Sequence, residues 1–327
     1  MRYVVVGAGA VGGTVGGRLY DAGHDVVLVA RGAHAEAMRR DGLRLALPDR
    51  VLTVRAPVAT SVGEVMFTPD DVVLLATKTQ DTAAALDDLT AARHDLPIAC
   101  IQNGVANERM VSERFGGVYG VVVMLPAVLL EPGRIDAQGH PFSGLLDLGR
   151  APSGIDDLAK QIAADLTDSG FVSQAVPDVM RWKYAKLLRN LGNAIEALCG
   201  HDLSDVDLAL VAELDQRLRD EGEACFAAAG IEWTSDEEWF ARRKEQVQWT
   251  PVEGRDRAGG SSWQSLARGS GSIEADYLNG EITELGRRHL VPTPANAAVQ
   301  RLATAAASAG APPGSMTVSE LRRHVDG

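Results

Sequence analysis

The most informative part of the N-terminal sequence is Val4-Val5-Val6-Gly7-Ala8-Gly9-Ala10-Val11-Gly12. A β-branched run leads directly into the spacing GxGxxG and then into a helix-forming sequence, which is typical of a strand, a tight turn and a helix. The first glycine permits the turn, the second lets the main chain approach a pyrophosphate, and the third allows close packing of helix on strand. We therefore expect a dinucleotide at the N-terminus of this helix. The expected contacts are Gly7, Ala8, Gly9, Ala10, Val11 and Gly12.

Short apolar runs and helical patterns alternate through the first half of the chain. The runs are nearly uninterrupted, as in parallel strands that are buried on both faces. This alternation predicts an α/β domain with a doubly wound sheet of the Rossmann type. The expected strands are Tyr3–Val6, Val26–Ala30, Val72–Ala76, Ile98–Ile101 and Val118–Val123, and the expected helices are Val11–Ala22, Ala33–Arg40, Thr79–Leu89 and Asn107–Phe115.

Two further pairs of short runs indicate additional strands. Leu43–Leu47 and Val51–Ala56 are separated by Pro48-Asp49-Arg50, which predicts an inserted hairpin. A second pair, Arg134–Ala137 and Leu145–Leu148, is expected to close the sheet.

Helical patterns replace strands from about Asp178 onward. We place one domain boundary near residue 176, because a chain of 327 residues exceeds the usual size of a single core. Residues 1–176 would form the Rossmann domain and residues 177–327 an all-helical C-terminal domain for substrate and catalysis. The expected helices are Met180–Leu198, Asp205–Ala229, Ser235–Gln248, Ser272–His289 and Pro294–Ala307, with a loop at Pro251–Ser262.

Composition narrows the partners of this protein. A net charge of −12 argues against nucleic acid and against anionic membranes, and leaves a small molecule as the expected partner. The three cysteines, Cys100, Cys199 and Cys225, follow neither a disulfide framework nor a metal-binding spacing, so we predict reduced thiols and no metal site. No stretch has the pattern of a signal peptide or a membrane span, and we expect a cytoplasmic protein.

The tip of the second strand bears on the choice of cofactor. NAD-binding domains usually have Asp or Glu there, to accept hydrogen bonds from the ribose hydroxyls. This chain reads Val29-Ala30-Arg31-Gly32, and the guanidinium of Arg31 suits a 2′-phosphate that a carboxylate would repel. We therefore predict NADPH. His34 is either a second contact to this phosphate or a solvated helix position.

Polar residues follow two other strands at the edge of the sheet where ligands bind. Lys78 and Gln80 come after one strand, and the alternative for them is a solvated first helical turn. Gln102-Asn103-Gly104 comes after the next strand, so an amide is expected beside the nicotinamide.

The segment Arg181–Asn193 is the most informative part of the second half. On one helix, Lys183, Lys186, Asn190 and Asn193 would fall within an arc of roughly 80°. Such a stripe is either a solvated face or a face toward a ligand. Asparagine is a poor helix former, which favours the ligand.

Hydroxyl groups gather at Ser261-Ser262-Trp263-Gln264-Ser265, where a carboxylate is a plausible ligand. Glu274 follows near the start of a predicted helix. The helix dipole alone would explain a carboxylate there, so its spacing leaves a functional role open.

Together these features resemble the ketopantoate reductase family, also called the 2-dehydropantoate 2-reductases. The resemblance spans nearly the whole chain in the right order. It rests on Gly7–Gly12, Arg31, Lys78, Gln102-Asn103-Gly104, Lys186 with Asn190, Ser261-Ser262, and Glu274–Gly280.

The resemblance implies an active site in the cleft between a Rossmann domain and a helical domain. Lys186 would be the proton donor, and Glu274 would contact the cofactor and order the site. Arg31, Lys78 and Asn103 would bind NADPH, and the implied substrate contacts are Asn103, Lys186, Asn190, Asn193, Ser262 and Ser265. NADPH would deliver a hydride to C2 of a 2-oxo acid, with ketopantoate in pantothenate biosynthesis as the leading substrate. Many relatives are homodimers, although no residue here establishes one.

The substrate side departs from the family pattern at several positions. Ala194 stands where a second helix asparagine is expected, with the amide one residue earlier at Asn193. Ser204 and Leu266 replace a further asparagine and an acid, and the stretch Val123–Pro126 lacks the family's histidine. These departures favour, as a rival, reduction of another 2-oxo acid or of an imine. A non-catalytic NADPH-binding regulator is a more distant alternative.

Overall fold

The computed structural model describes residues 1–243, 246–253, 255 and 259–327, and its contacts divide the chain into two compact units. The first unit comprises Met1–Lys183 and Thr234–Asp256, and the second comprises Tyr184–Trp233 and Arg257–Gly327. This division differs from the single boundary expected near residue 176. The chain returns to the first unit after residue 233.

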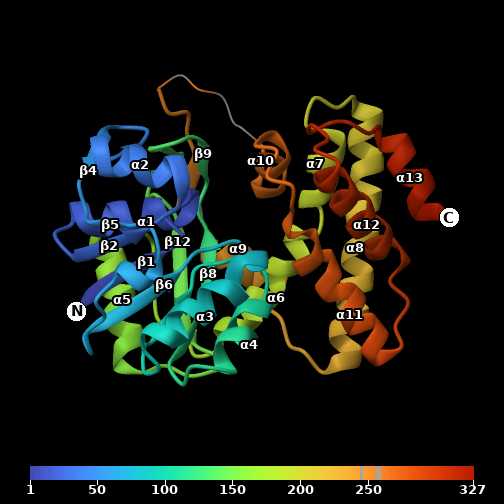
Figure 1. Ribbon diagram of the computed structural model, residues 1–327. Helices are drawn as coiled ribbons and strands as arrows, with labels where there is room; N and C mark the ends of the chain where they lie inside the picture. The colour runs from blue at the N-terminus through green and yellow to red at the C-terminus, as the bar shows by residue number, and fades with distance from the viewer. Residues whose placement is uncertain (244–245, 254, 256–258) are drawn as a thin grey trace. The chain divides into compact units, whose positions relative to one another are not determined.

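A seven-stranded sheet forms the centre of the first unit (Figure 1). Its strands are β1 (Arg2–Val6), β2 (Asp25–Val29), β5 (Val58–Ala59), β6 (Asp71–Leu75), β7 (Ile98–Cys100), β8 (Val118–Met124) and β12 (Leu145–Arg150). Their spatial order is β12-β8-β7-β6-β1-β2-β5, and all neighbours are parallel except β12 and β8. The chain order reverses between β1 and β6, which is the topological switch point where doubly wound sheets bind ligands. The prediction of a Rossmann-type sheet is confirmed.

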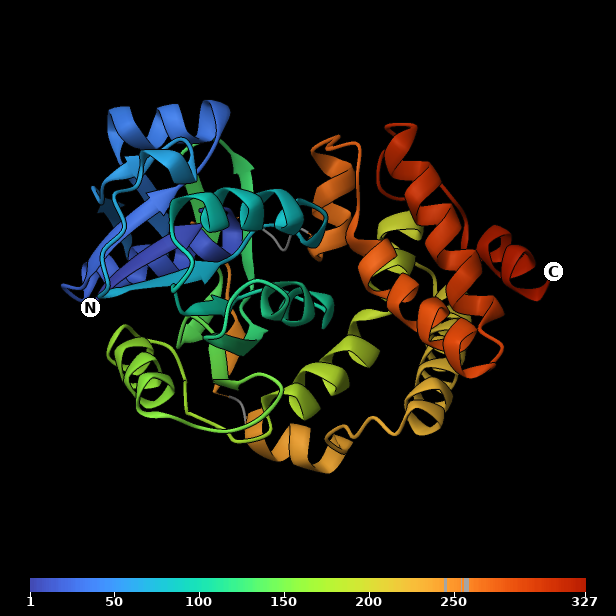
Figure 2. The same cartoon turned by 60° about the horizontal axis from the view of Figure 1, so that its bottom comes forward.

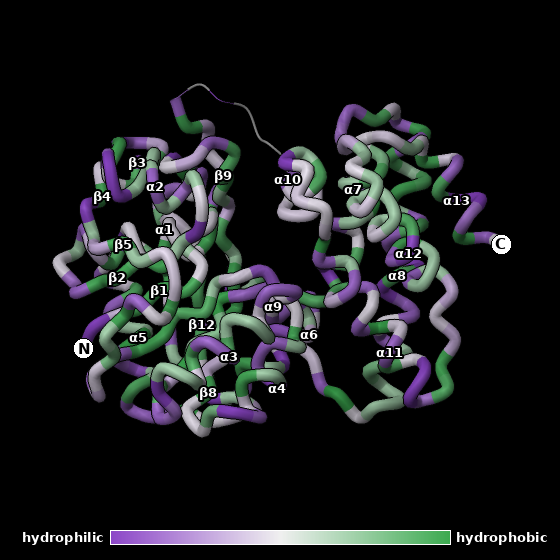
Figure 3. Tube along the Cα trace, in the orientation of Figure 1, coloured by the Kyte–Doolittle hydropathy of each residue, from purple (hydrophilic) through white to green (hydrophobic). Residues whose placement is uncertain are grey.

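Side chains alternate between the two faces of this sheet. Tyr3 and Val5 of β1 point to one face, and Val4 and Val6 point to the other. Helices α1 (Ala10–Asp21) and α5 (Asp157–Asp168) cover the first face, and α3 (Thr82–Ala92) and α4 (Ala106–Ser112) cover the second. In Figure 3 the central strands are predominantly green, which marks hydrophobic residues. Burial on both faces explains why these strands read as continuous apolar runs.

Helix α1 is rich in glycine because it packs against two sheets. A Cβ atom at Gly12 would lie 2.3 Å from the carbonyl oxygen of Gly7, and one at Gly16 would lie 2.5 Å from Leu28 of the central sheet. On another side of the helix, a Cβ atom at Gly13 would lie 2.3 Å from Ile135, and one at Gly17 would lie 3.0 Å from Leu45. Ile135 and Leu45 belong to a second, smaller sheet.

That second sheet contains β3 (Leu43–Ala46), β4 (Val51–Val54), β9 (Ala127–Glu131) and β10 (Arg134–Ala137), in the order β4-β3-β10-β9. The hairpin of β3 and β4 confirms a prediction. The expectation that Arg134–Ala137 and Leu145–Leu148 close the central sheet is confirmed for β12, which lies at its edge beside β8, and is wrong for β10, which pairs with β3 and β9 in the second sheet. The apolar stretch before β10 contains another strand, β9, and β10 forms an antiparallel hairpin with it.

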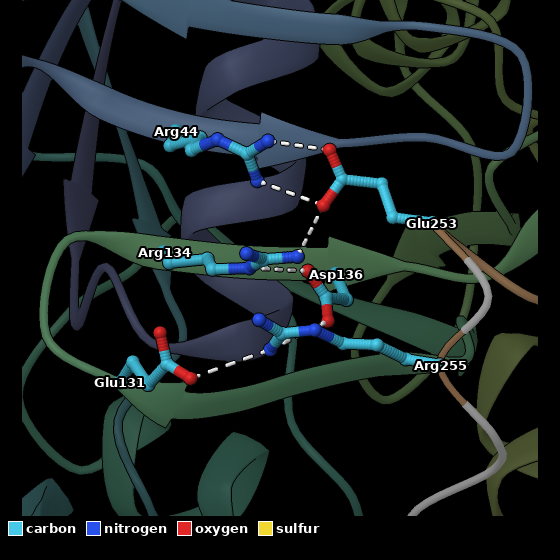
Figure 4. A network of polar contacts seen from close by, with 6 residues as sticks. All are labelled: Arg44, Glu131, Arg134, Asp136, Glu253 and Arg255. Carbon is cyan, nitrogen blue, oxygen red and sulfur yellow. Dashed lines mark hydrogen bonds and ion pairs between the residues drawn. The ribbon is translucent and has the colours of Figure 1, made fainter.

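A network of six charged side chains lies on the second sheet (Figure 4). Its members are Arg44, Glu131, Arg134, Asp136, Glu253 and Arg255. Glu253, whose backbone φ is 49°, forms ion pairs with Arg44 and, at 2.6 Å, with Arg134. Hydrogen bonding from Arg44 and Arg134 lowers the pKa of Glu253 to about 2. The network holds residues 253 and 255 against the second sheet.

Helix α9 (Asp236–Arg243) and strand β13 (Val247–Trp249) also belong to the first unit. Within the helix predicted at Ser235–Gln248, α9 covers Asp236–Arg243, and Val247 and Gln248 belong to strand β13. Residues 244–245 lie outside the described part of the chain. Strand β13 pairs with β11 (Gly139–Pro141). Arg242 forms two hydrogen bonds, of 2.7 and 2.6 Å, with the buried carboxylate of Asp147. These non-local contacts explain why the segment returns to the Rossmann unit.

All regular elements among the described residues of the second unit are helical, which confirms the predicted helical C-terminal domain. Its elements are the end of α6 (Val179–Asn190), α7 (Asn193–Cys199), α8 (Asp205–Ala229), α10 (Ser261–Ala267), the 3₁₀ turn η3 (Glu274–Tyr277), α11 (Asn279–His289), α12 (Pro294–Ser308) and α13 (Val318–Asp326). Figure 2 shows the long helix α8 beside α11 and α12, with which it makes contacts. No helix among the described residues is long and apolar enough to cross a membrane.

Two predicted helices of the second unit are interrupted. Met180–Leu198 is divided into α6 and α7 at Leu191-Gly192, where a Cβ atom on Gly192 would lie 2.3 Å from a carboxylate oxygen of Asp215. Ser272–His289 contains the short turn η3 before α11. The predicted loop Pro251–Ser262 lies partly outside the described residues, and α10 already begins at Ser261.

Candidate active site

The glycine-rich turn lies at the switch point of the central sheet. Gly7 has a φ of 98°, and a Cβ atom on it would lie 2.7 Å from the amide nitrogen of Thr77. A Cβ atom on Gly9 would meet nothing within 4 Å, although this residue caps α1. Gly7 and Gly12 are thus required by protein packing. Gly9 instead leaves open space at a helix N-terminus, which is the geometry that admits a pyrophosphate.

Ala8 shapes this turn through its main chain. Its N–H donates to the carbonyl of Val29 at 2.9 Å, and its own carbonyl lies 2.8 Å from Nε2 of His34. The N–H of Gly133 donates to Nδ1 of the same ring at 2.8 Å. Since Nδ1 accepts a hydrogen bond, the proton of the neutral ring is on Nε2, which donates to Ala8.

His34 is therefore a structural residue of the turn. Burial lowers the pKa of its imidazole, which keeps the ring neutral. A neutral, half-buried ring whose two nitrogens both bond to the main chain fits neither alternative, since it is neither a cationic partner for a phosphate nor a solvated helix position. Arg31, by contrast, is exposed at the tip of β2 and precedes the first turn of α2 (Gly32–Asp41).

Three loops meet at the carboxyl edge of the sheet. The glycine turn follows β1, Thr77-Lys78 follows β6, and Gln102-Asn103 follows β7. The close approach of Gly7 to Thr77 joins the first two loops, and a hydrogen bond of 2.8 Å from Nε2 of Gln102 to the carbonyl of Thr77 joins the last two. The first unit thus brings together the predicted cofactor residues of these loops.

Buried amides support the turn that carries Asn103. Nε2 of Gln102 also donates to Oγ1 of Thr82 at 2.9 Å, and Thr82 donates to Oδ1 of Asn107 at the same distance. Nδ2 of Asn107 donates in turn to the carbonyl of Asn103 at 3.2 Å. Gly104, with a φ of 76°, completes the turn in a conformation that favours glycine.

Lys186 and Asn190 lie one turn apart on α6, as the sequence predicted. Nζ of Lys186 donates to Oδ1 of Asn190 at 3.5 Å. Lys186 is half-buried, and Asn190 is buried. The pair presents an amine and an amide from one helix face, which is a combination that suits an oxygen-rich ligand.

Asn193 is not part of this helix face. It is the first residue of α7, because helix α6 ends at Asn190. Nδ2 of Asn279 donates to the carbonyl of Leu191 at 3.2 Å and ties the start of α11 to this break. The arc derived for a continuous helix therefore holds for Lys186 and Asn190, and not for Asn193.

Helix α10 carries the two serines that the sequence indicated for substrate. The N–H of Gly260 donates to the carboxylate of Glu196 at 3.1 Å, which ties the start of α10 to α7. Oγ of Ser265 donates to the carbonyl of Ser261 at 3.0 Å. Oγ of Ser262 is buried and has no hydrogen-bond partner within the described ranges, and a buried hydroxyl of this kind suits a polar ligand. Glu274 is the first residue of η3 and is also buried.

The environment of Lys183 differs from the one predicted. The sequence interpretation grouped this residue with Lys186 on a ligand-facing stripe. Its ammonium forms an ion pair of 2.7 Å with Glu108 inside the first unit, and both side chains are almost fully buried. Burial raises the pKa of Glu108, against the opposing effect of Lys183. No local signal in the sequence links these two residues.

A Rossmann-type unit with an open glycine turn, followed by a helical unit with a half-buried amine beside a buried amide, defines the class of two-domain dinucleotide-binding oxidoreductases. The chain matches the family described as ketopantoate reductase PanE/ApbA over residues 3–152, and the C-terminal part of that family over residues 178–307. It belongs to the ketopantoate reductase family and is an oxidoreductase of the 2-dehydropantoate 2-reductase type.

Individual relatives cover almost the whole chain. A 2-dehydropantoate 2-reductase of Archaeoglobus fulgidus is 31% identical over 87% of this chain and 90% of the relative. A ketopantoate reductase of the PanE/ApbA family from Ralstonia eutropha JMP134 is 27% identical, with a TM-score of 0.77 over 95% of this chain and 99% of that one. D-mandelate dehydrogenase, solved with NADH and anilino(oxo)acetate, shares the fold at 22% identity, with a TM-score of 0.78 over 95% of this chain and 99% of that one.

Proposed function

We propose that this protein reduces 2-dehydropantoate to pantoate with NADPH, as a step of pantothenate biosynthesis. The observation that carries the proposal is the open glycine turn at the switch point, with Arg31 and no acid at the tip of the neighbouring strand. Membership of the ketopantoate reductase family supplies the reaction class.

The residues of the first unit fit a dinucleotide. The absence of a side chain at Gly9 leaves room for a pyrophosphate, and the first N–H groups of α1 have no partner within the helix. We assign Arg31 to the 2′-phosphate, since His34 is held neutral. Lys78 and Asn103 would complete the contacts at the ends of β6 and β7.

The chemistry assigned to the helical unit is proton transfer to oxygen. When bound, NADPH supplies a hydride to C2 of the 2-oxo acid. The protonated amine of Lys186 polarises the carbonyl and then gives its proton to the oxygen, which leaves a 2-hydroxy acid. Asn190 orients the amine through the contact at 3.5 Å, and Ser262 supplies a hydroxyl to the substrate. Glu274 is proposed to favour the charged form of Lys186 and to contact the cofactor.

A second candidate is the reduction of a different 2-oxo acid or of an imine. Oγ of Ser204, at the place of an expected asparagine, is engaged in capping α8, where it accepts from the N–H of Asp207 at 3.2 Å. Ala194 and Leu266 are buried apolar residues of the helical unit. Ala194 and Leu266 thus lack the polar groups that the family pattern leads us to expect, and the hydroxyl of Ser204 is already engaged within its own helix. D-mandelate dehydrogenase, which shares the fold, was solved with NADH and anilino(oxo)acetate.

Parallel turnover assays separate the two candidates. Ketopantoate, simpler 2-oxo acids, and an oxo acid with an amine are each tested with NADPH and with NADH. We expect the highest kcat/KM for ketopantoate with NADPH. Turnover of ketopantoate no faster than that of the other oxo acids would exclude the pantothenate assignment.

A variant of the proposed proton donor tests the mechanism. Lys186→Ala is expected to bind NADPH as the wild type does and to lose at least about 100-fold in kcat, the usual contribution of a general acid. Lys160→Ala, which removes an exposed lysine of α5, is the matched control and should leave kcat unchanged. Unchanged turnover in Lys186→Ala would refute the mechanism, and NADPH binding without turnover in the wild type would instead favour a regulator.

A further inference from the structure

We propose that Lys183 is a positioning residue of the active site, whose buried ammonium, held by Glu108, fixes the main chain that carries Asn103. The inference rests on the proposed function, in which Asn103 contacts the cofactor and the substrate. All of the contacts that support it lie within the first unit.

Three oxygen atoms surround the ammonium of Lys183. Nζ donates to the carbonyl of Gln102 at 2.9 Å and to the carbonyl of Val121 at 3.2 Å, and it lies 2.7 Å from Oε1 of Glu108. The ammonium thus donates two hydrogen bonds to main-chain carbonyls, and the carboxylate of Glu108 balances its charge. The Lys183 side chain is 2% exposed, so this amine acts on protein atoms and does not serve as a proton donor to substrate.

The contact with Gln102 bears directly on Asn103. The carbonyl of Gln102 belongs to the peptide group before the Cα atom of Asn103, and the carbonyl of Asn103 belongs to the peptide group after it. Lys183 holds the first carbonyl, and Asn107 holds the second at 3.2 Å. Fixing both peptide planes fixes φ and ψ of Asn103, because these are the soft backbone dihedrals. Glu108 follows Asn107 on α4, so one helical turn supports both contacts.

Close packing of helix α6 on strand β8 places Lys183 beside the carbonyl of Gln102. Helix α6 crosses β8 at Gly120, where a Cβ atom would lie 3.2 Å from Val179 and 3.3 Å from Cδ of Lys183. The lysine stem fills this space. A buried ion pair is seldom more stable than apolar residues of the same volume, so stability alone does not account for the pair. The hydrogen bond from the Lys183 ammonium to the carbonyl of Gln102 gives the pair a positioning role that does account for its presence.

The test compares two buried ion pairs of the same unit. Lys183→Met removes the donor and keeps most of the volume. The matched control is Arg242→Met, which breaks the pair of Arg242 with the buried Asp147. Each variant is assayed with NADPH and the best 2-oxo acid at a temperature where circular dichroism shows it folded. Amide hydrogen exchange of peptides that cover residues 101–107 is measured in parallel.

We expect Lys183→Met to lose about 10- to 100-fold in kcat, the effect of a small misplacement at a reacting centre. Exchange at the Asn103 turn should be at least about tenfold faster, because local opening becomes easier. The Kd of NADPH, set largely at the glycine turn, should stay within about threefold of the wild type. Arg242→Met should change neither kcat nor exchange at this turn.

Two results would overturn the inference. One is a folded Lys183→Met variant with wild-type kcat and wild-type exchange at residues 101–107. The other is an equal loss of kcat in Arg242→Met, which would show a general effect of destabilisation. Should Lys183→Met fail to fold, Glu108→Gln, which preserves the shape, takes its place. It should lower kcat by at least about threefold through the lost charge-assisted contact, and unchanged kcat and exchange would again overturn the inference.

The proposed function and this inference fail in different ways. A wild-type protein that reduces none of the oxo acids excludes the proposed function. Hydrogen exchange at the turn requires no substrate and still decides whether Lys183 holds Asn103.

Discussion

Two glycines of the same turn should respond in opposite ways to the same substitution. A Cβ atom on Gly12 would lie 2.3 Å from the carbonyl oxygen of Gly7 and 2.8 Å from Cβ of Ala76. A Cβ atom on Gly9 would meet no protein atom within 4 Å. Gly12→Ala therefore perturbs the packing of helix on strand, whereas Gly9→Ala perturbs only the space left for a ligand.

The magnitudes follow from these contacts. Overpacking of a core costs about 1–3 kcal/mol, which corresponds to a fall of about 2–12 °C in the Tm of Gly12→Ala. In Gly9→Ala two effects on stability oppose each other. Alanine is a poorer helix N-cap than glycine, which destabilises the fold, but it also reduces the conformational entropy of the unfolded chain, which stabilises the fold by a similar amount. The backbone of Gly9, with φ −75° and ψ −159°, is open to alanine. We expect its Tm to change by less than about 2 °C.

Cofactor binding separates the two variants further. The new methyl group of Gly9→Ala occupies the path of the pyrophosphate, and we expect the Kd of NADPH to rise at least tenfold, or about 1.4 kcal/mol. Thermal unfolding without cofactor and a fluorescence titration with NADPH measure the two effects. Binding of NADPH by Gly9→Ala as tight as that of the wild type, or a loss of stability equal to that of Gly12→Ala, would contradict this prediction.

Two further predictions concern the same part of the first unit. Arg31→Ala should raise the Kd of NADPH by about 10- to 100-fold through loss of charge-assisted hydrogen bonds, and an equal effect on NADH in the same titration would disprove the 2′-phosphate assignment. His34 has a folded-state pKa lowered below 6.5 by burial, so the unfolded chain binds more protons near that pH. Its stabilisation is present above pH 6.5 and is lost as the pH falls through the folded-state pKa. The Tm of the wild type should therefore fall more between pH 7.5 and pH 5 than the Tm of His34→Gln. An equal fall in Tm for both proteins would contradict the conclusion that the His34 ring is neutral in the folded protein.

Features that depend on local backbone chemistry and on periodicity could be predicted from the amino-acid sequence. The turn of Gly7, Gly9 and Gly12 was predictable because each glycine meets a steric requirement set within a few residues. The central strands and the pair of Lys186 and Asn190 were predictable because burial on both faces and helical spacing leave a pattern along the chain.

Contacts between groups that are distant in the sequence became known from the folded structure alone. The partnership of Lys183 with Glu108, the hydrogen bonds of His34 to Ala8 and Gly133, and the return of α9 to the first unit join residues that are far apart in the sequence. A polarity pattern shows that a lysine lies on a helix face, but it does not show what packs against that face. The break before Asn193 has the same cause, since the group that packs closely against Gly192 is Asp215 of another helix.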